Sequence, residues 1–449
     1  MKKLKVSSYE SSLIVLCSPL LDDEELMLPN LDQEWKNWLS LAVLNRIETQ
    51  VFNSLTRRNI AVPKNVMQAL AERAHTVIEQ NRKRRTEAKL LFATLEKERI
   101  PFIVLKGNAL AQEIYQDLDY KQMNDFDLLF QPKDLDKLEI IYKKMDYLSA
   151  ASLDPKFRKQ EKYSHHWPPF FSRNMHLFLG THWNLVSPFS KVKIPDEALW
   201  KNVESFTFDG QNLQRLGKEN FLLHLCVHLS PYKLGLKELA DLYNFIFYFE
   251  KQIRWDDFIK LVQGTNAEDS TYRAFSILQS LFQSAIIDKV ISAIESTVSK
   301  SIRSEVRVRT QPPIKALYIR TGHVSKIEKN FGFFSLSDKP SEKAYFLFKM
   351  WKNYLWAPWE ECFRLCHEIP NPSLLKRLVY SCRSIREINR SFITDLGLKV
   401  YVLVTLQHHI ELTKAIFNKL IGKPCEGIAQ KANKLGLALT DLKNLSQVE

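Results

Sequence analysis

Glycine and proline are scarce in this chain, which has 12 glycines and 18 prolines among 449 residues. Few turn-forming residues favour helices over the many short strands of a β-sandwich. The glycine-rich signatures of three enzyme classes are also missing, namely Gly-x-x-x-x-Gly-Lys-Ser/Thr, Gly-x-Gly-x-x-Gly and Gly-x-Ser-x-Gly. The sequence therefore excludes a P-loop enzyme and gives no support to a Rossmann or kinase-type loop or to a serine hydrolase elbow.

Long hydrophobic runs and regularly spaced cysteines are absent too. Residues 12–21 are apolar, but this run is shorter than the roughly 20 residues of a membrane helix and lacks an Ala-x-Ala-like cleavage site. The six cysteines do not have the spacing of a disulfide framework. Cys362 and Cys366 beside His367 lack the second ligand pair of a zinc finger, so we expect buried thiols there. We expect a cytoplasmic protein with reduced thiols and no membrane partner.

The chain has fewer acidic than basic residues, with 51 aspartates and glutamates and 64 lysines and arginines. Its formal charge is +13. Such a charge suits a polyanionic partner, either nucleic acid or the phosphates of a nucleotide. The more common explanation is a solvated basic surface. The same alternatives apply to the basic cluster at residues 82–85, which we expect to lie on a solvated helix face.

The hydrophobic pattern changes twice along the chain and predicts a helix-rich α+β fold. Helical periodicity from about residue 34 to residue 98 ends at Pro101, which breaks a helix because it lacks an N–H. Helical patterns resume after residue 216. We expect an N-terminal helical segment at 1–98, an α/β core at 99–210, a helical domain at 211–300, and a basic, mostly helical C-terminal region at 301–449.

The core is predicted to alternate strands and helices in a small mixed β-sheet flanked by helical segments. The expected strands are 102–105, 125–130 and 175–183, and the expected helices are 108–115 and 134–145. A linker or exposed surface is expected at residues 300–320, which Pro312-Pro313 interrupts.

An Asp-x-Asp pair lies inside the second expected strand. Side chains at i and i+2 of a strand share a face, so Asp125 and Asp127 would stand side by side while Phe126 and Leu128 are buried. Two adjacent carboxylates repel each other unless a cation lies between them. Hard oxygen ligands favour Mg²⁺ or Mn²⁺, so the pair indicates phosphoryl or nucleotidyl transfer. The alternative is a solvated strand edge.

The turn after the first strand, Lys106-Gly107, is the matching candidate for phosphate binding. Lys106 would provide a mobile positive charge, and Gly107 would let the backbone approach phosphates where a Cβ would intrude. An ordinary strand-to-helix turn is the alternative. Asn108 follows at the position of a helix N-cap, so we expect a structural role for its side chain. A contact with the nucleotide is the secondary expectation.

Two histidine pairs have weaker patterns. His224 and His228 share a helix face, but Leu225 stands where a zinc protease needs a glutamate, so we expect them to pack in the interior. His165 and His166 lie in a proline-containing loop before the third expected strand. This loop could bring them to the site, and the sequence favours neither this role nor a purely structural one.

Several of these motifs occur in an order that resembles a known family. They are Ile103-Val104-Leu105-Lys106-Gly107-Asn108-Ala109-Leu110, Met123-Asn124-Asp125-Phe126-Asp127-Leu128-Leu129, His182-Trp183 and Leu239-Ala240-Asp241. The chain resembles the uncharacterised nucleotidyltransferase family proteins of bacteria, which are distant relatives of the DNA polymerase β-like nucleotidyltransferase superfamily. The resemblance covers roughly residues 30–260.

The resemblance implies a turn that presents backbone amides to a nucleoside triphosphate, and an Asp-x-Asp pair that binds two divalent ions. A third acidic residue on a later strand would complete the site, but this chain has Gly180 there, with His182 on the same face. Lys121 stands where relatives have an arginine, four residues before the first aspartate, and is expected to assist in nucleotide binding.

The activity that follows is transfer of a nucleoside monophosphate from a nucleoside triphosphate to an acceptor, with release of pyrophosphate and with Mg²⁺ or Mn²⁺ as cofactor. The acceptor is an RNA, a protein or a small molecule. Because position 180 is a glycine, the alternative is a catalytically degenerate module that binds or regulates. The expected catalytic residues are Asp125, Asp127 and His182, with Asp125 and Asp127 as metal ligands, and the expected nucleotide-binding residues are Lys106, Gly107, Asn108 and Lys121.

Overall fold

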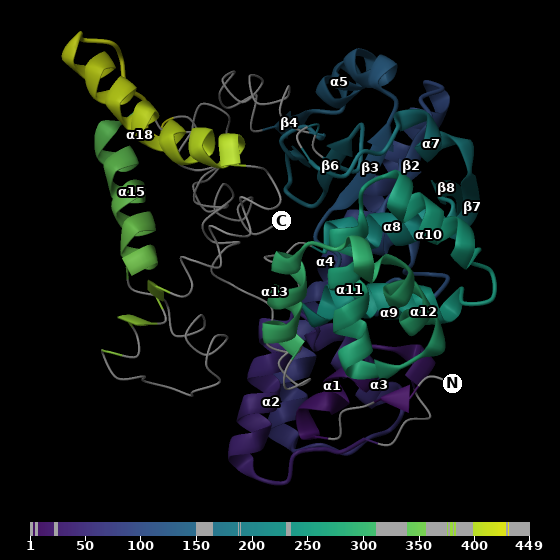
Figure 1. Ribbon diagram of the computed structural model, residues 1–449. Helices are drawn as coiled ribbons and strands as arrows, with labels where there is room; N and C mark the ends of the chain where they lie inside the picture. Colours follow the sequence, from purple (N-terminus) through teal and green to yellow (C-terminus); the bar gives the residue numbers. More distant parts are fainter. Residues whose placement is uncertain are drawn as a thin grey trace. The chain divides into compact units, whose positions relative to one another are not determined.

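The computed structural model describes residues 3–4, 8–21, 26–149, 165–186, 188, 190–229, 235–310, 339–355, 375, 378–379, 381–382, 398–427 and 430. Contacts between residues divide the chain into two compact units. The first comprises Met1–Leu148, His165–Ser187 and Val192–Arg320, and the second comprises Ser149–Ser164, Pro188–Lys191 and Thr321–Glu449. Figure 1 labels their helices and strands.

The N-terminal part of the first unit is helical, as the sequence predicts. Its helices are α1 (Ser12–Leu16), α2 (Asp32–Leu44), α3 (Glu48–Arg57) and α4 (Lys64–Lys97). Helix α4 is 34 residues long and ends just before Arg99, which has a left-handed backbone with φ 56°. The left-handed residue and the following Pro101 stop the helix and lead the chain into the first strand of the sheet.

A seven-stranded mixed sheet lies at the centre of the first unit. Its strands, in spatial order, are β4 (Tyr147–Ser149), β5 (Phe170–Ser172), β6 (Phe178–His182), β3 (Phe126–Phe130), β2 (Phe102–Val104), β8 (Gln211–Leu216) and β7 (Val203–Phe208). Strands β3 and β6 run parallel, as do β2 and β8, whereas β2 and β3 are antiparallel. The predicted helix-rich α+β fold with a mixed sheet is therefore confirmed. A separate ribbon pairs β1 (Lys3–Leu4) with β9 (Phe282–Gln283).

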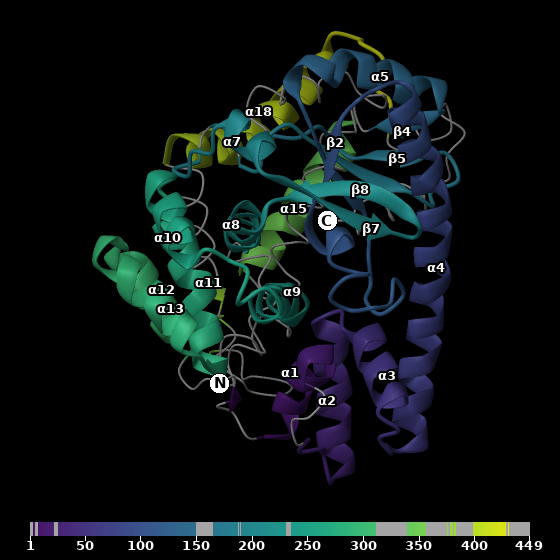
Figure 2. The same cartoon turned by 90° about the vertical axis from the view of Figure 1, so that its right-hand side faces the viewer.

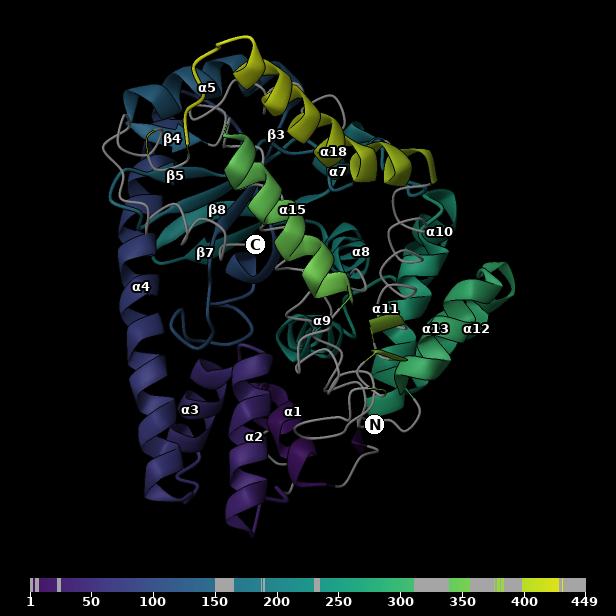
Figure 3. The same cartoon turned by 90° about the vertical axis from the view of Figure 1, so that its left-hand side faces the viewer.

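Helix α4 packs on the sheet through aromatic side chains. The ring of Phe92 stacks on Phe102 of β2, with 5.2 Å between ring centroids, and meets Phe126 and Phe208 edge-on at 5.8 and 6.4 Å. Figures 2 and 3 show α4 running along the sheet from opposite sides. Aromatic clusters bury a large apolar area, so this contact fixes α4 against β2 and β3.

Further helices follow the strands in sequence. They are α5 (Leu135–Lys144), α7 (Asp196–Lys201), α8 (Lys218–His228), α9 (Leu236–Tyr248), α10 (Trp255–Gly264), α11 (Glu268–Leu281), α12 (Ala285–Ile294) and α13 (Lys300–Thr310). Helix α8 packs against β8 and stacks its Phe221 ring on Phe245 of α9, with 4.9 Å between centroids. In Figure 2, α8 and α4 lie on opposite sides of the sheet, so the strands are covered on both faces.

Two predicted segments differ from the structure. The expected helix at 108–115 is wrong, because Lys106–Ala109 form a single 3₁₀ turn, η3, and residues 110–115 continue as turns. Lys106 has φ 57°, a left-handed conformation that cannot start a right-handed helix. The expected linker at 300–320 is wrong in its first half, which forms α13, and Pro312-Pro313 lies outside the described residues.

The hairpin of β7 and β8 was not expected from the sequence. Its turn is Asp209-Gly210, with φ 46° and 80°, which is a common signal for a tight hairpin. Strand β8 begins at Gln211, just after residue 210 where we expect the core to end, yet it pairs with β2 in the middle of the sheet.

In the second unit, α15 (Pro340–Leu355) packs against α18 (Leu398–Leu420), with the Trp351 and His409 ring centroids 6.1 Å apart. Most of the C-terminal region that the sequence predicts to be helical lies outside the described residues, so this expectation stays a prediction. Among the helices described in either unit, none has the length and apolarity to cross a membrane. The described cysteines, Cys17, Cys226, Cys382 and Cys425, are free thiols. Cys362, Cys366 and His367 lie outside the described residues.

Candidate functional site

The central strands bring three predicted site residues together. Strand β3 lies between β2 and β6, and Asp127 on β3 is paired with Gly180 on β6. The backbone N–H of Leu105 at the end of β2 donates to the carbonyl of Asp127 at 2.9 Å. Lys106 at the start of η3 and His182 at the end of β6 therefore lie on either side of Asp127.

Both carboxylate oxygens of Asp127 have partners. The Lys106 ammonium forms an ion pair with Oδ2, and His182 Nε2 lies 2.9 Å from Oδ1. A carboxylate only accepts hydrogen bonds, so Nε2 of His182 carries the proton. Burial alone would raise the pKa of Asp127, but the charge of Lys106 and the bond from His182 hold this pKa well below its usual range. Asp127 is therefore an ionised carboxylate in a buried site.

His182 is neutral in this arrangement. Burial lowers the pKa of His182 to about 4, although the bond to Asp127 opposes this shift. The rings of His165 and His166 lie 5.6 and 5.1 Å from the His182 ring between centroids. His166 Nδ1 is 2.8 Å from the carbonyl of Trp167, so this nitrogen carries a proton. The loop histidines thus belong to the same cluster as His182.

Asn108 and Asp125 are linked through the backbone. The Asn108 side-chain amide donates to the carbonyl of Asp125 at 2.7 Å, so the expected N-cap role of Asn108 is wrong. This contact ties η3 to the residue before β3. The other side-chain atom, Asn108 Oδ1, is buried and has no hydrogen-bond partner among the described residues. The Asp125 side chain is half-buried, and its charge acts on the Arg84 guanidinium, whose pKa burial lowers.

Lys121 lies behind the turn rather than beside Asp127. Its side chain is 2% exposed, and its ammonium is 2.5 Å from both carboxylate oxygens of Asp241 on α9. The Tyr115 hydroxyl donates to Asp241 at 2.7 Å. A Cβ added to Gly107 would lie 2.4 Å from the Lys121 ammonium, so a larger residue there would force the Lys121–Asp241 pair to shift. The predicted role of Lys121 in nucleotide binding stays a prediction, and its observed partner is Asp241.

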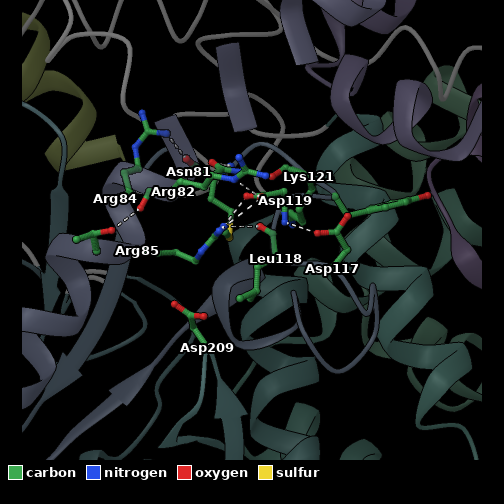
Figure 4. A network of polar contacts seen from close by, with 12 residues as sticks. Asn81, Arg82, Arg84, Arg85, Asp117, Leu118, Asp119, Lys121 and Asp209 are labelled. Carbon is green, nitrogen blue, oxygen red and sulfur yellow. Dashed lines mark hydrogen bonds and ion pairs between the residues drawn. The ribbon is translucent and has the colours of Figure 1, made fainter. Parts of the chain in front are cut away.

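Side chains of α4 hold the loop that leads into β3 (Figure 4). Arg85 forms an ion pair with Asp119 at 2.5 Å, and Asn81 donates to the carbonyl of Lys121 at 2.9 Å. Arg84 donates to the carbonyl of Met123 at 2.9 Å. The basic cluster at 82–85 is therefore a solvated helix face only in part, because the Arg85 side chain is 12% exposed whereas that of Arg82 is 68% exposed.

Gly180 faces the Asp127 carboxylate. A Cβ added to Gly180 would lie 2.0 Å from Asp127 Oδ1 and 3.0 Å from His182 Nε2. The side chain of Asp127 thus occupies the space that any side chain at position 180 would need. A third carboxylate here would require Asp127 to move.

The donor set fits a hard divalent cation that shares its ligands with a substrate. No group of three or more His, Cys, Asp or Glu side chains among the described residues is arranged to hold a metal. Mg²⁺, however, is commonly held by one or two carboxylates together with substrate phosphates and water. Asp127 provides one such carboxylate, and Asp125, the second predicted ligand, is tied to η3 through its backbone by Asn108, whose buried Oδ1 has no partner among the described residues. The residues present therefore fit a metal that binds together with a phosphate-bearing substrate.

His224 is the site residue that sequence reasoning missed. It lies on α8, which packs against η3, and its burial agrees with the packing role expected from the sequence. Its Nδ1 nevertheless has no hydrogen-bond partner among the described residues. Burial and the charge of Lys106 lower the pKa of His224 to about 3, which makes the ring neutral. The spacing of His224 and His228 marks a shared helix face, but it does not reveal that α8 packs against η3, which depends on the tertiary fold.

Comparisons with known proteins agree with the resemblance noted from the motifs. A family model described as uncharacterised nucleotidyltransferase matches residues 32–283, which include every candidate residue above. Neither a curated protein nor a solved structure matches the chain significantly.

Proposed function

The chain belongs to the uncharacterised nucleotidyltransferase family, and from this premise we propose that it transfers a nucleoside monophosphate from a nucleoside triphosphate to an acceptor. The acceptor hydroxyl oxygen forms a bond to the α-phosphorus and loses its proton to water. The bond between the α-phosphorus and the bridging oxygen breaks, and pyrophosphate leaves.

The observation that carries the proposal is the buried Lys106–Asp127–His182 cluster between the central strands. An ammonium beside an ionised carboxylate can exchange partners when a polyphosphate arrives. Lys106 would then bind the β- and γ-phosphates as a point charge, and the Asp127 oxygen that it releases would face a cation. When bound, Mg²⁺ or Mn²⁺ would supply the positive charge that the α-phosphate needs, held by Asp125 and Asp127.

His182 and Lys121 act as positioning residues in this proposal. Neutral His182 donates to Asp127 Oδ1 and fixes the orientation of the carboxylate without competing for its charge. Lys121 supports Gly107 from behind through its ion pair with Asp241, so that the turn keeps the conformation that presents Lys106. Asn108 fixes the backbone of Asp125 and offers its Oδ1 to a donor on the bound substrate.

A second candidate function rests on Gly180. In relatives a third carboxylate completes the metal site, whereas here the Asp127 side chain fills the space next to position 180. A site with two carboxylates and a lysine can bind a nucleotide without transferring it. The second candidate is therefore a nucleotide-binding module that has lost catalysis.

Label transfer tests the proposal. The protein is incubated with each α-labelled nucleoside triphosphate, Mg²⁺ or Mn²⁺, and a cell lysate depleted of nucleotides. We expect label on an RNA, protein or small-molecule fraction, and at least about a hundredfold less label with Asp127→Asn. Asp136→Asn on α5 is the matched control, because Asp136 is exposed and lies outside the site.

Two other results lead to different conclusions. Transfer by Asp127→Asn at the wild-type rate would contradict the metal assignment. Metal-dependent nucleotide binding without any transfer would favour the degenerate module.

A further inference from the structure

The buried imidazole of His224 has no role in the activity proposed above. His224 is 3% exposed, and its Nδ1 lacks a hydrogen-bond partner within the described part of the chain. Leaving a buried polar atom unpaired costs free energy, of the order of 1–3 kcal/mol, and such atoms are rare in folded proteins. His224 Nδ1 is one of several such atoms among the described residues, and it lies on the helix that packs against η3, where a bound ligand would supply its partner.

The position of His224 indicates where that ligand lies. Helix α8 packs against η3, the turn that carries Lys106 and Asn108. The charges of Lys106 and Asp127 and the ring of His182 all act on the His224 ring, so it belongs to the same electrostatic environment. On its own helix, His224 stacks only loosely on His228, with 6.0 Å between ring centroids.

A second buried polar atom without a hydrogen-bond partner among the described residues lies in η3, the turn against which α8 packs. Asn108 Oδ1 is buried without a partner, and the bond from its amide to the Asp125 carbonyl fixes which atom is the oxygen. An amide oxygen only accepts, whereas an imidazole nitrogen that bears a proton donates. A ligand that satisfies both atoms must carry acceptors and donors near a cationic lysine. A hydrated metal–triphosphate has both, in its phosphate oxygens and its metal-bound water.

We propose that His224 is a substrate-binding residue whose Nδ1–H donates a hydrogen bond to the triphosphate held by Lys106. This inference rests on the proposed function, because it assigns a further residue to the same nucleotide site. A neutral imidazole suits this place, since a second cation beside Lys106 would repel it, whereas a neutral N–H binds phosphate oxygen at no such cost. The orphaned nitrogen is then preorganised for the leaving group of the reaction.

Isothermal calorimetry tests this inference. It measures the affinity of the protein for inorganic triphosphate with Mg²⁺ and for each nucleoside triphosphate with Mg²⁺. His224→Leu removes both ring nitrogens and fills the volume, so we expect triphosphate binding about tenfold to a hundredfold weaker. The melting temperature of His224→Leu should equal or exceed that of the wild type, because an unpaired buried polar atom is lost. His228→Leu on the same helix is the control and should bind as the wild type does.

A pair of conservative variants tests the position of the nitrogen. His224→Asn places a polar atom where Nδ1 lies, whereas His224→Gln places it near Nε2. We expect His224→Asn to bind triphosphate several-fold more tightly than His224→Gln. This comparison remains decisive if the leucine variant does not fold.

Three results would overturn one or other proposal, and they can be told apart. Wild-type affinity of the folded His224→Leu protein for triphosphate would overturn the role of His224. Weaker binding of the nucleotide with unchanged binding of inorganic triphosphate would overturn the assignment to the phosphates. No binding of either ligand by the wild-type protein would overturn the proposed function itself.

Discussion

Lys106 and Asp127 neutralise each other in the free protein, and the proposed nucleotide complex requires both to change partner. The left-handed backbone of Lys106, φ 57°, is uncommon for a residue with a Cβ and places its ammonium over the carboxylate. Such conformations are found most often at functional sites, where the surrounding structure holds them in place. In the free protein the Lys106 ammonium therefore takes the place of the metal at Asp127. Likewise, the Asp127 carboxylate takes the place of a substrate phosphate at Lys106.

Substitution of Lys106 by methionine separates these two roles. Lys106→Met is expected to weaken nucleoside triphosphate binding by about tenfold to a hundredfold, because a charged hydrogen-bond donor is lost. Binding of Mn²⁺ alone should become tighter, because no ammonium competes for Asp127. Since the charge of Lys106 also lowers the pKa of Asp127, the variant is measured near pH 8, where the carboxylate stays ionised.

The control for this experiment is Lys137→Met on α5, whose side chain is 51% exposed and pairs with Glu98. It should leave both affinities unchanged. Weaker Mn²⁺ binding by Lys106→Met would contradict the account, because it would mean that the ammonium does not compete with the metal.

At the scale of elements, a buried polar network supports the η3 turn. Lys121 pairs with Asp241, and the Tyr115 hydroxyl donates to Asp241 and accepts from the Asn244 amide at 3.2 Å. The network joins α9 to the loop before β3, and a Cβ at position 107 would displace the Lys121 ammonium from it. The turn that presents Lys106 thus depends on residues that are distant from it in sequence.

A double-mutant cycle measures this dependence. Breaking a buried ion pair by removing one partner leaves an uncompensated charge, so Lys121→Met and Asp241→Asn should each lower the free energy of unfolding by about 3–5 kcal/mol. The double variant should lose less than the sum of the two, because neither charge remains. Urea denaturation gives the three values.

The exposed pair Lys83–Glu79 on α4 provides the comparison, since its side chains are 48% and 68% exposed. Its cycle should give a coupling of only about 0–1 kcal/mol. Additive losses for Lys121 and Asp241 would show that the buried pair does not act as a unit.

The elements that the sequence predicts well are those with local signals. The strands at 102–105 and 125–130 have apolar runs next to a proline or a polar turn, and the structure has β2 and β3 there within a residue or two. The turn η3 was mistaken for a helix because nothing local reveals the left-handed Lys106. Strand β8 was missed because its sequence, Gln-Asn-Leu-Gln-Arg-Leu, lacks the alternation of a strand, and it becomes a central strand only through pairing with β2.

The same division holds for the candidate site. Motifs predict Asp127, Lys106 and His182 as site residues, and the structure has the three in contact with one another through Asp127. The pairing of Lys121 with Asp241 and the burial of His224 beside η3 could not be predicted from motifs, because they join segments more than a hundred residues apart. Long-range contacts of this kind follow from packing of whole elements and leave no periodic pattern in the sequence.

At the scale of the whole molecule, the family match spans residues 32–283, and most of this range belongs to the first unit, whereas Ser149–Ser164 and Pro188–Lys191 belong to the second. The net charge of +13 is compatible with a polyanionic acceptor such as RNA, which is one of the three acceptor classes proposed. Charge alone does not choose among them, because nucleotide phosphates and a solvated surface account for it equally well. The acceptor is identified by the fraction that takes up label.

The most direct test of the central claim is a crystal structure of the protein with Mn²⁺ and a non-hydrolysable nucleoside triphosphate analogue, in which anomalous scattering locates the metal. We expect a Mn²⁺ peak at coordination distance from Asp125 and Asp127, with the Lys106 ammonium on a phosphate oxygen rather than on Asp127. An intact Lys106–Asp127 ion pair, with the analogue and the metal bound elsewhere, would contradict the account.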